Sequence, residues 1–196
     1  YFTIKFIIKL QIPKVFASYF IVYVGIVVAA VTAPAFEAIS IGTAAFWFGF
    51  ATLLLLLVLV TIRYIKFKQI PEPAQPLICI YAAPTSLCVA GYVQSITPKS
   101  KGFLLTMLVL ASILYVFALI KAIGYLKLKF YPSFAAFTFP FVISAIATKQ
   151  TMACLANMKQ PMPFLQYIVL IETIIAVIFV IYTFIRYMQF LFAPNK

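Results

Sequence analysis

The chain has 196 residues, of which 66% are hydrophobic and only 9% are charged, and its formal net charge is +12. No soluble domain needs so much apolar sequence, so the composition predicts an integral membrane protein. Histidine is absent, and the acidic residues are Glu37, Glu72 and Glu172 alone. Acid–base and nucleophilic catalysis lack their usual groups, so we expect no catalytic site and no enzyme activity.

Two further kinds of site are excluded by the remaining composition. The three cysteines fall within apolar runs and form no CxxC pair, so we expect no metal site and no cofactor. The lysines gather near the ends of apolar runs and not along an aromatic face, so nucleic acid is not a predicted partner. The lipid bilayer is the predicted partner of the apolar surface.

The sequence predicts one all-α membrane domain over residues 15–192. Residues 1–14 are interpreted as a cytoplasmic linker from missing upstream helices, and residues 193–196 as a cytoplasmic tail. Each of six apolar segments is long enough to cross the hydrocarbon layer as a helix. Their predicted bounds are 15–34, 42–65, 77–96, 102–126, 131–158 and 164–192. The proline-rich segment Lys66–Pro76 is expected to be a loop between two helical hairpins.

Basic residues are distributed unequally between the two sides that six spans define. One side holds eleven of them, namely Lys5, Lys9, Lys14, Arg63, Lys66, Lys68, Lys121, Lys127, Lys129, Arg186 and Lys196. The other side holds four, namely Lys99, Lys101, Lys149 and Lys159. The positive-inside rule therefore predicts that both termini are cytoplasmic in a multi-pass protein of the plasma membrane.

Chain-breaking residues fall on alternate spans. Pro34, Pro84 and Pro140 belong to the first, third and fifth spans, and the even spans contain no proline. In the first span, Gly25 lies at a mid-span position comparable to those of Pro84 in the third span and Pro140 in the fifth. Small residues follow these positions and let helix backbones approach closely in lipid, so we expect the odd spans to form an inner ring. Proline is common in membrane helices generally, but that frequency does not explain the alternation.

A bulky aromatic residue directly precedes the kink in the fifth span. Proline supplies no N–H at this depth, so the bent backbone is tolerable only inside protein or beside a cavity. Phe139 lies directly before Pro140 and Phe137 three residues before it, and both are candidates for a plug in a pore.

Two segments carry a resemblance to a known family. Residues 131–147 (YPSFAAFTFPFVISAIA) and 80–90 (IYAAPTSLCVA) resemble the tellurite-resistance/dicarboxylate transporter family, which includes the plant slow anion channel and fungal malate carriers. The resemblance implies a ten-helix, quasi-fivefold pore fold with kinked inner helices, of which this chain matches the last six helices as three hairpins. It also implies a homotrimer, a bacterial source and a pore gate at Phe139, with Phe137 as the weaker candidate.

The same resemblance implies transport of an anion through a central pore. Substrates in that class are small organic acids such as malate, or inorganic anions and oxyanions. Gly25, Pro84 and Pro140 are the expected pore-lining kinks. The chain departs from the family pattern at Gly25, which replaces a mid-span proline, and at Ala135 and Ala136, which replace bulky aromatics of the plant channel.

Two charged residues lie at membrane depth. Lys149 and Glu172 are at comparable depth, so they are predicted to form a structural ion pair, with Lys149 lining the conduit as the alternative. Glu172 could instead couple transport to protons, which would make the protein a proton-coupled carrier. A non-transporting structural or assembly subunit is a further alternative, because small-residue faces also pack against partner helices.

Overall fold

The computed structural model describes residues 12–192, so the predicted tail and most of the predicted linker lie outside the described residues. Among the described residues the regular elements are all helices, and six helical segments are long and apolar enough to cross a membrane. Their bounds are Tyr19–Phe36, Ile39–Lys66, Glu72–Ser95, Lys101–Tyr125, Pro132–Asn157 and Leu165–Phe192. The predicted six-span, all-α membrane fold is confirmed.

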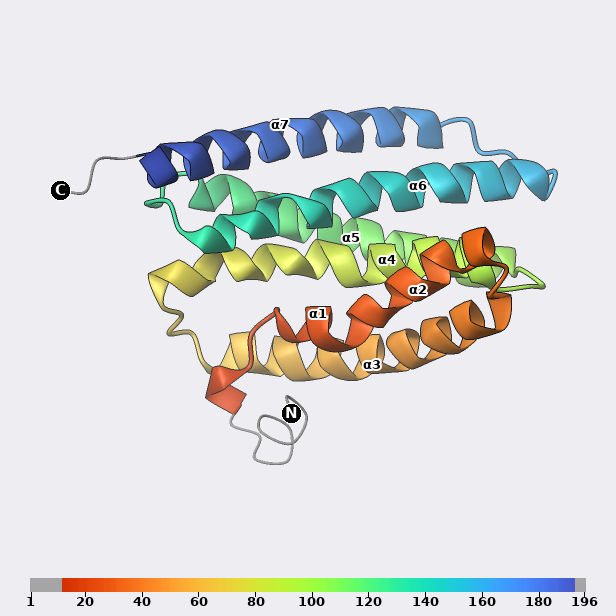
Figure 1. Cartoon of the computed structure of the whole chain (residues 1–196), viewed down its shortest axis with the longest axis horizontal. Helices are drawn as coiled ribbons and strands as arrows, with labels where there is room; N and C mark the ends of the chain where they lie inside the picture. Colours follow the sequence, from red (N-terminus) through yellow and green to blue (C-terminus); the bar gives the residue numbers. More distant parts are fainter. Residues whose placement is uncertain (1–11, 193–196) are drawn as a thin grey trace.

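The helices lie side by side along the long axis of the molecule (Figure 1). α7 (Leu165–Phe192) forms one edge and α3 (Ile39–Lys66) the other, while α4 (Ala82–Ser95) lies between them. α4 contacts α2 (Val27–Thr32), α3, α5 (Lys101–Tyr125) and α6 (Phe139–Asn157). The third span is therefore central, and 89% of its most apolar window is buried, against 22% for the sixth span.

Odd and even spans differ in regularity. The even spans are the continuous α-helices α3, α5 and α7. Each odd span combines α-helix with the tighter 3₁₀ helix. The first contains α1 (Tyr19–Tyr23), 3₁₀ helix Val24–Ile26, α2 and 3₁₀ helix Ala33–Phe36; the third joins 3₁₀ helix Glu72–Tyr81 to α4; the fifth joins 3₁₀ helix Pro132–Phe137 to α6. The expected alternation between two classes of helix is present in the backbone.

The third span begins earlier than the proline pattern predicts. A loop was expected as far as Pro76, but the chain is helical from Glu72. Pro73 falls in the first turn, where an amide N–H has no intrahelical partner, so proline costs little there. Pro76 lies inside the helix, which winds as 3₁₀ and not as α at this point.

At Val27 the first span approaches two neighbouring helices closely. A Cβ atom on Gly91 of α4 would lie 2.5 Å from Val27 Cγ1, and a Cβ on Gly49 of α3 would clash with Val27 Cγ2. Glycine at both positions therefore lets α2 settle against α3 and α4. Ser95 Oγ also donates a hydrogen bond to the Ala30 carbonyl of α2.

The two ends of the bundle differ in charge. Ile12–Lys14 and the end of α7 lie at one end (Figure 1), which also carries the turns 67–71 and 126–131 and is called the basic end below. The opposite end carries the turns 37–38, 96–100 and 158–164.

Arg63 is buried at the basic end, with only 2% of its surface exposed. Its guanidinium donates hydrogen bonds to the carbonyls of Phe67 and Pro13 and lies 4.6 Å above the Phe16 ring. Arg63 thus ties the segment before the first span to the end of α3. From the sequence, Arg63 was counted only as one of the eleven basic residues of that side.

Candidate functional site

Three odd spans meet along one groove with a volume of about 640 Å³, called the three-kink groove below. Its lining residues are Phe20, Ile21, Val24, Gly25, Val28, Leu77, Ile80, Ala83, Pro84, Leu87, Pro132, Ser133, Ala135, Ala136, Phe139 and Pro140. Gly25, Pro84 and Pro140 come from positions more than 50 residues apart in the chain, yet the fold brings them to a single surface. No even span contributes to it.

The backbone changes winding where these residues lie. Gly25 is the central residue of the short 3₁₀ helix between α1 and α2. Pro84 is in the first turn of α4, just after the Glu72–Tyr81 3₁₀ helix ends. Pro140 is in the first turn of α6, and Thr138 breaks the fifth span there with φ −97° and ψ −89°. The irregular backbone thus faces a cavity, as membrane depth requires.

The two candidate gate residues occupy different environments. Phe139 lines the groove, and 49% of its surface is exposed. Phe137 is fully buried, and its ring contacts those of Phe134 and Phe179 at centroid distances of 4.9 and 5.8 Å. Phe137 is therefore a core residue of the α6–α7 hairpin and is unavailable to a pore on this face.

The wall of the groove is almost entirely apolar. Its one hydroxyl group belongs to Ser133, whose Oγ is buried without a hydrogen-bond partner. Among residues 12–192, no charged side chain lines it. Ala135 and Ala136 lie in the wall, so their small side chains leave space next to Phe139.

A pair of serines joins the two central kinked spans. Ser86 Oγ of α4 and Ser144 Oγ of α6 are 3.0 Å apart, and both are buried. Ser86 Oγ is also 2.8 Å from the Ala82 carbonyl and Ser144 Oγ 2.9 Å from the Pro140 carbonyl, so one serine donates its single proton to the other serine, and that second serine donates to the carbonyl of its own helix. These hydroxyls follow Pro84 and Pro140 closely and fix the start of α4 against the start of α6.

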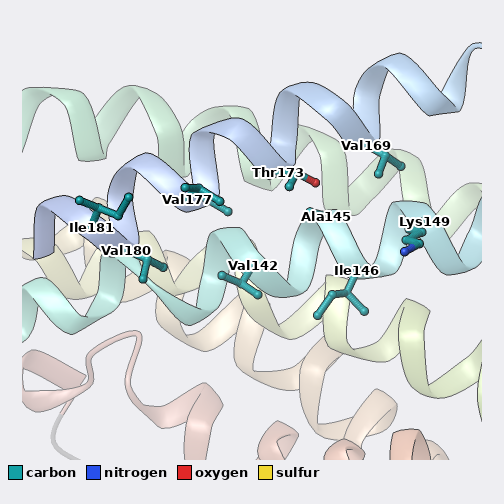
Figure 2. Close-up of a pocket in the computed structure, with 10 residues that line it drawn as sticks. Val142, Ala145, Ile146, Lys149, Val169, Thr173, Val177, Val180 and Ile181 are labelled. Carbon is teal, nitrogen blue, oxygen red and sulfur yellow. The ribbon is translucent and has the colours of Figure 1, made fainter. Parts of the chain in front are cut away.

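Lys149 lies away from the three-kink groove. It lines a second groove of about 350 Å³ between α6 and α7, together with Thr173 and otherwise apolar residues. Figure 2 shows Lys149 near one end of a row formed by Val142, Ile146, Val177 and their neighbours.

The expected ion pair between Lys149 and Glu172 is not formed. Glu172 is 4% exposed, and its carboxyl group lies near the side chains of Thr148 and Tyr115. One of its carboxyl oxygens, Oε2, has no hydrogen-bond partner. Equal depth in two helices does not place side chains on facing surfaces, because the helices present different faces at that depth.

The comparison with protein families agrees with the fold. Residues 1–188 match the family SLAC1, the voltage-dependent anion channels. The chain belongs to this family. No curated protein and no solved structure matches the chain.

Membership in the voltage-dependent anion channel family confirms the resemblance seen in the two sequence segments. It indicates anion transport through a channel in a lipid bilayer and is consistent with the absence of an enzyme activity. The six spans accordingly make the chain a multi-pass membrane protein. The sequence did not identify the buried residues around Glu172. It also did not identify the polar residues that α4 and α6 bring together at the end of the bundle opposite the basic end.

Proposed function

We infer that the three-kink groove is a wall of the anion conduit and that Phe139 is its steric plug. The observation that carries this proposal is that Gly25, Pro84, Pro140 and Phe139 line one cavity, while Phe137 is buried in the core. Three separate breaks in helical regularity converge on this surface, and such breaks at membrane depth are expected beside a cavity.

The apolar wall suits conduction of a weakly held anion. An ion must enter a conduction site and also leave it, so strong charged ligands would slow its passage. A weak attraction is available from α6, whose N-terminus at Phe139 opens into the groove and carries the positive end of the helix dipole. The proposed substrates are small organic acids, including C4-dicarboxylates such as malate, and inorganic anions or oxyanions.

The groove is open along one side, where Ile21 and Val28 are exposed. A closed conduit needs a wall there, which the remaining inner helices of a ten-helix ring would supply. The surplus of basic residues at the basic end further supports a cytoplasmic location for that end.

Removal of the Phe139 ring tests the plug. Phe139→Ala in the complete protein, reconstituted in liposomes, should increase nitrate or malate flux several-fold. Phe137→Ala is the matched control, because it removes the same ring from the core; it should lower thermal stability without opening the pore. Unchanged flux in Phe139→Ala at normal protein density would refute the assignment.

If the complete wild-type protein conducts none of the tested anions and instead purifies with other subunits, the assembly role replaces transport. A proton gradient that drives uptake, with loss of this coupling in Glu172→Gln, would favour the proton-coupled carrier.

A further inference from the structure

A polar pocket of about 370 Å³ lies between α4 and α6 at the end opposite the basic end. It is lined by Val93, Gln94, Lys99, Gln150, Ala153, Cys154, Asn157 and Met158. We propose that this polar pocket binds a small anion and loads it into the conduit. The inference rests on the proposed function, since it names the place at which an anion enters from that side.

The side chains of the polar pocket offer hydrogen-bond donors and one positive charge. Lys99 supplies an ammonium group, and Gln94, Gln150 and Asn157 supply amide groups that can donate N–H bonds. Gln150 Oε1 is buried without a hydrogen-bond partner, and a turn of this amide about its last bond would put its NH₂ group in place of that oxygen. The volume equals that of about twelve waters at about 30 Å³ each, enough for a partly hydrated anion.

No carboxylate competes for Lys99 in the described part of the chain. Glu37 is exposed in the turn 37–38, Glu72 begins the third span at the basic end, and Glu172 is buried between α5, α6 and α7. None of them lines the polar pocket. An unpaired ammonium group at a concave surface attracts anions and raises their local concentration.

The turn that carries Lys99 is anchored to α4. The Ser100 N–H donates to the hydroxyl of Tyr92 at 2.7 Å, and Tyr92 is itself only 3% exposed. The backbone next to Lys99 is therefore fixed against the same helix that supplies Gln94. This fixed geometry lowers the entropy lost when a ligand is bound.

The polar pocket lies in line with the three-kink groove. Leu87 of the groove and Gln94 of the pocket are seven residues apart on α4, and Phe139 and Gln150 are eleven apart on α6. At about 100° per residue both pairs fall within roughly 20° of the same helix face. The two cavities are thus displaced by about 10 to 17 Å along shared faces of α4 and α6.

The test compares Lys99→Gln with Lys159→Gln in the complete protein. Lys159 is exposed at the same end but does not line the pocket, so both variants lose one charge from one surface. With nitrate supplied from the pocket side, Lys99→Gln should raise the half-saturating concentration about threefold or more, while Lys159→Gln should leave it near the wild-type value.

A second measurement does not depend on transport. Nitrate should raise the melting temperature of the purified wild-type protein and of Lys159→Gln more than that of Lys99→Gln, because a ligand stabilises the state that binds it. Gln150→Leu keeps the charge of Lys99 and should also weaken the stabilisation by nitrate. It replaces Lys99→Gln as the test variant if Lys99→Gln does not fold. If Lys99→Gln and Lys159→Gln gave the same half-saturating concentration for flux and the same rise in melting temperature with nitrate, the proposed anion site in the polar pocket would be refuted. Absence of flux in the wild type would overturn the conduit alone, and the melting data would still decide the pocket.

Discussion

Ser86 Oγ of α4 lies 3.0 Å from Ser144 Oγ of α6, so that one serine donates to the other and the second donates to a carbonyl of its own helix next to a helix break. This contact joins the two kinked spans at the depth of the three-kink groove. In lipid, helix association has no hydrophobic drive, so packing and interhelical hydrogen bonds of this kind hold helices together.

The serine pair should contribute to stability as a unit. Ser86→Ala and Ser144→Ala are each expected to lower the free energy of unfolding, with a coupling of about 1 kcal/mol in a double-mutant cycle. Ser112→Ala is the control, because Ser112 donates within its own helix, to the Leu108 carbonyl at 2.9 Å. The free energy of unfolding in detergent is measured for the wild type, the two single variants, the double variant and the Ser112→Ala control, and additive losses would show that the pair makes no direct contribution.

Gly25 should limit the width of the conduit. A Cβ built on Gly25 meets no atom within 4 Å, and the residue lines the three-kink groove. Gly25→Leu should therefore fold normally and lower anion flux several-fold by filling the groove. Gly124→Leu, on α5 with equally open surroundings, should leave flux unchanged. Flux that is identical in both variants would place Gly25 outside the conducting path.

Val27 should make glycine obligatory at two positions. Gly91→Ala and Gly49→Ala are each expected to destabilise the protein by about 1 to 3 kcal/mol, because the added methyl group overlaps a Val27 methyl group. The substitution Val27→Ala removes the obstacle and should restore part of the loss in either variant. Gly124→Ala provides the comparison without a steric conflict. The melting temperature is the measurement, and a lack of rescue would show that the backbone contacts dominate.

Glu172 should be dispensable for transport. It lines neither the three-kink groove nor the polar pocket. Glu172→Gln keeps a group that can hydrogen-bond to Thr148 and removes a carboxyl group without a cationic partner, so stability should be equal or higher. Nitrate flux measured between about pH 5 and 8 should show the wild-type dependence. A flat pH profile in the variant would instead assign proton coupling to Glu172.

Local chain-breaking signals were enough to predict the kinked spans. Gly25, Pro84 and Pro140 each mark a change of winding because glycine and proline alter the backbone wherever they occur. Phe139 was preferred to Phe137 because of the family resemblance, which places the gating phenylalanine directly before the kink proline. The exclusion of Phe137 required the structure, since only the packed α7 shows that Phe179 covers it.

Tertiary placement could not be predicted from the same signals. Helical rise gives the depth of Lys149 and Glu172 but not the direction in which each side chain points, so the predicted ion pair between them was wrong. Proline content suggested a loop before Pro76, although a 3₁₀ helix accommodates Pro73 and Pro76. The polar pocket joins Lys99 with Gln150, about 50 residues later, and no local pattern indicates that encounter.

The mixed winding of the third span also sets its length. A 3₁₀ helix rises about 2.0 Å per residue and an α-helix about 1.5 Å. Ten residues of the first kind and fourteen of the second give Glu72–Ser95 a length of about 41 Å, while the 28 residues of α3 give about 42 Å. A central helix with four fewer residues therefore matches its lipid-facing neighbour in height, so the two can span the same bilayer together.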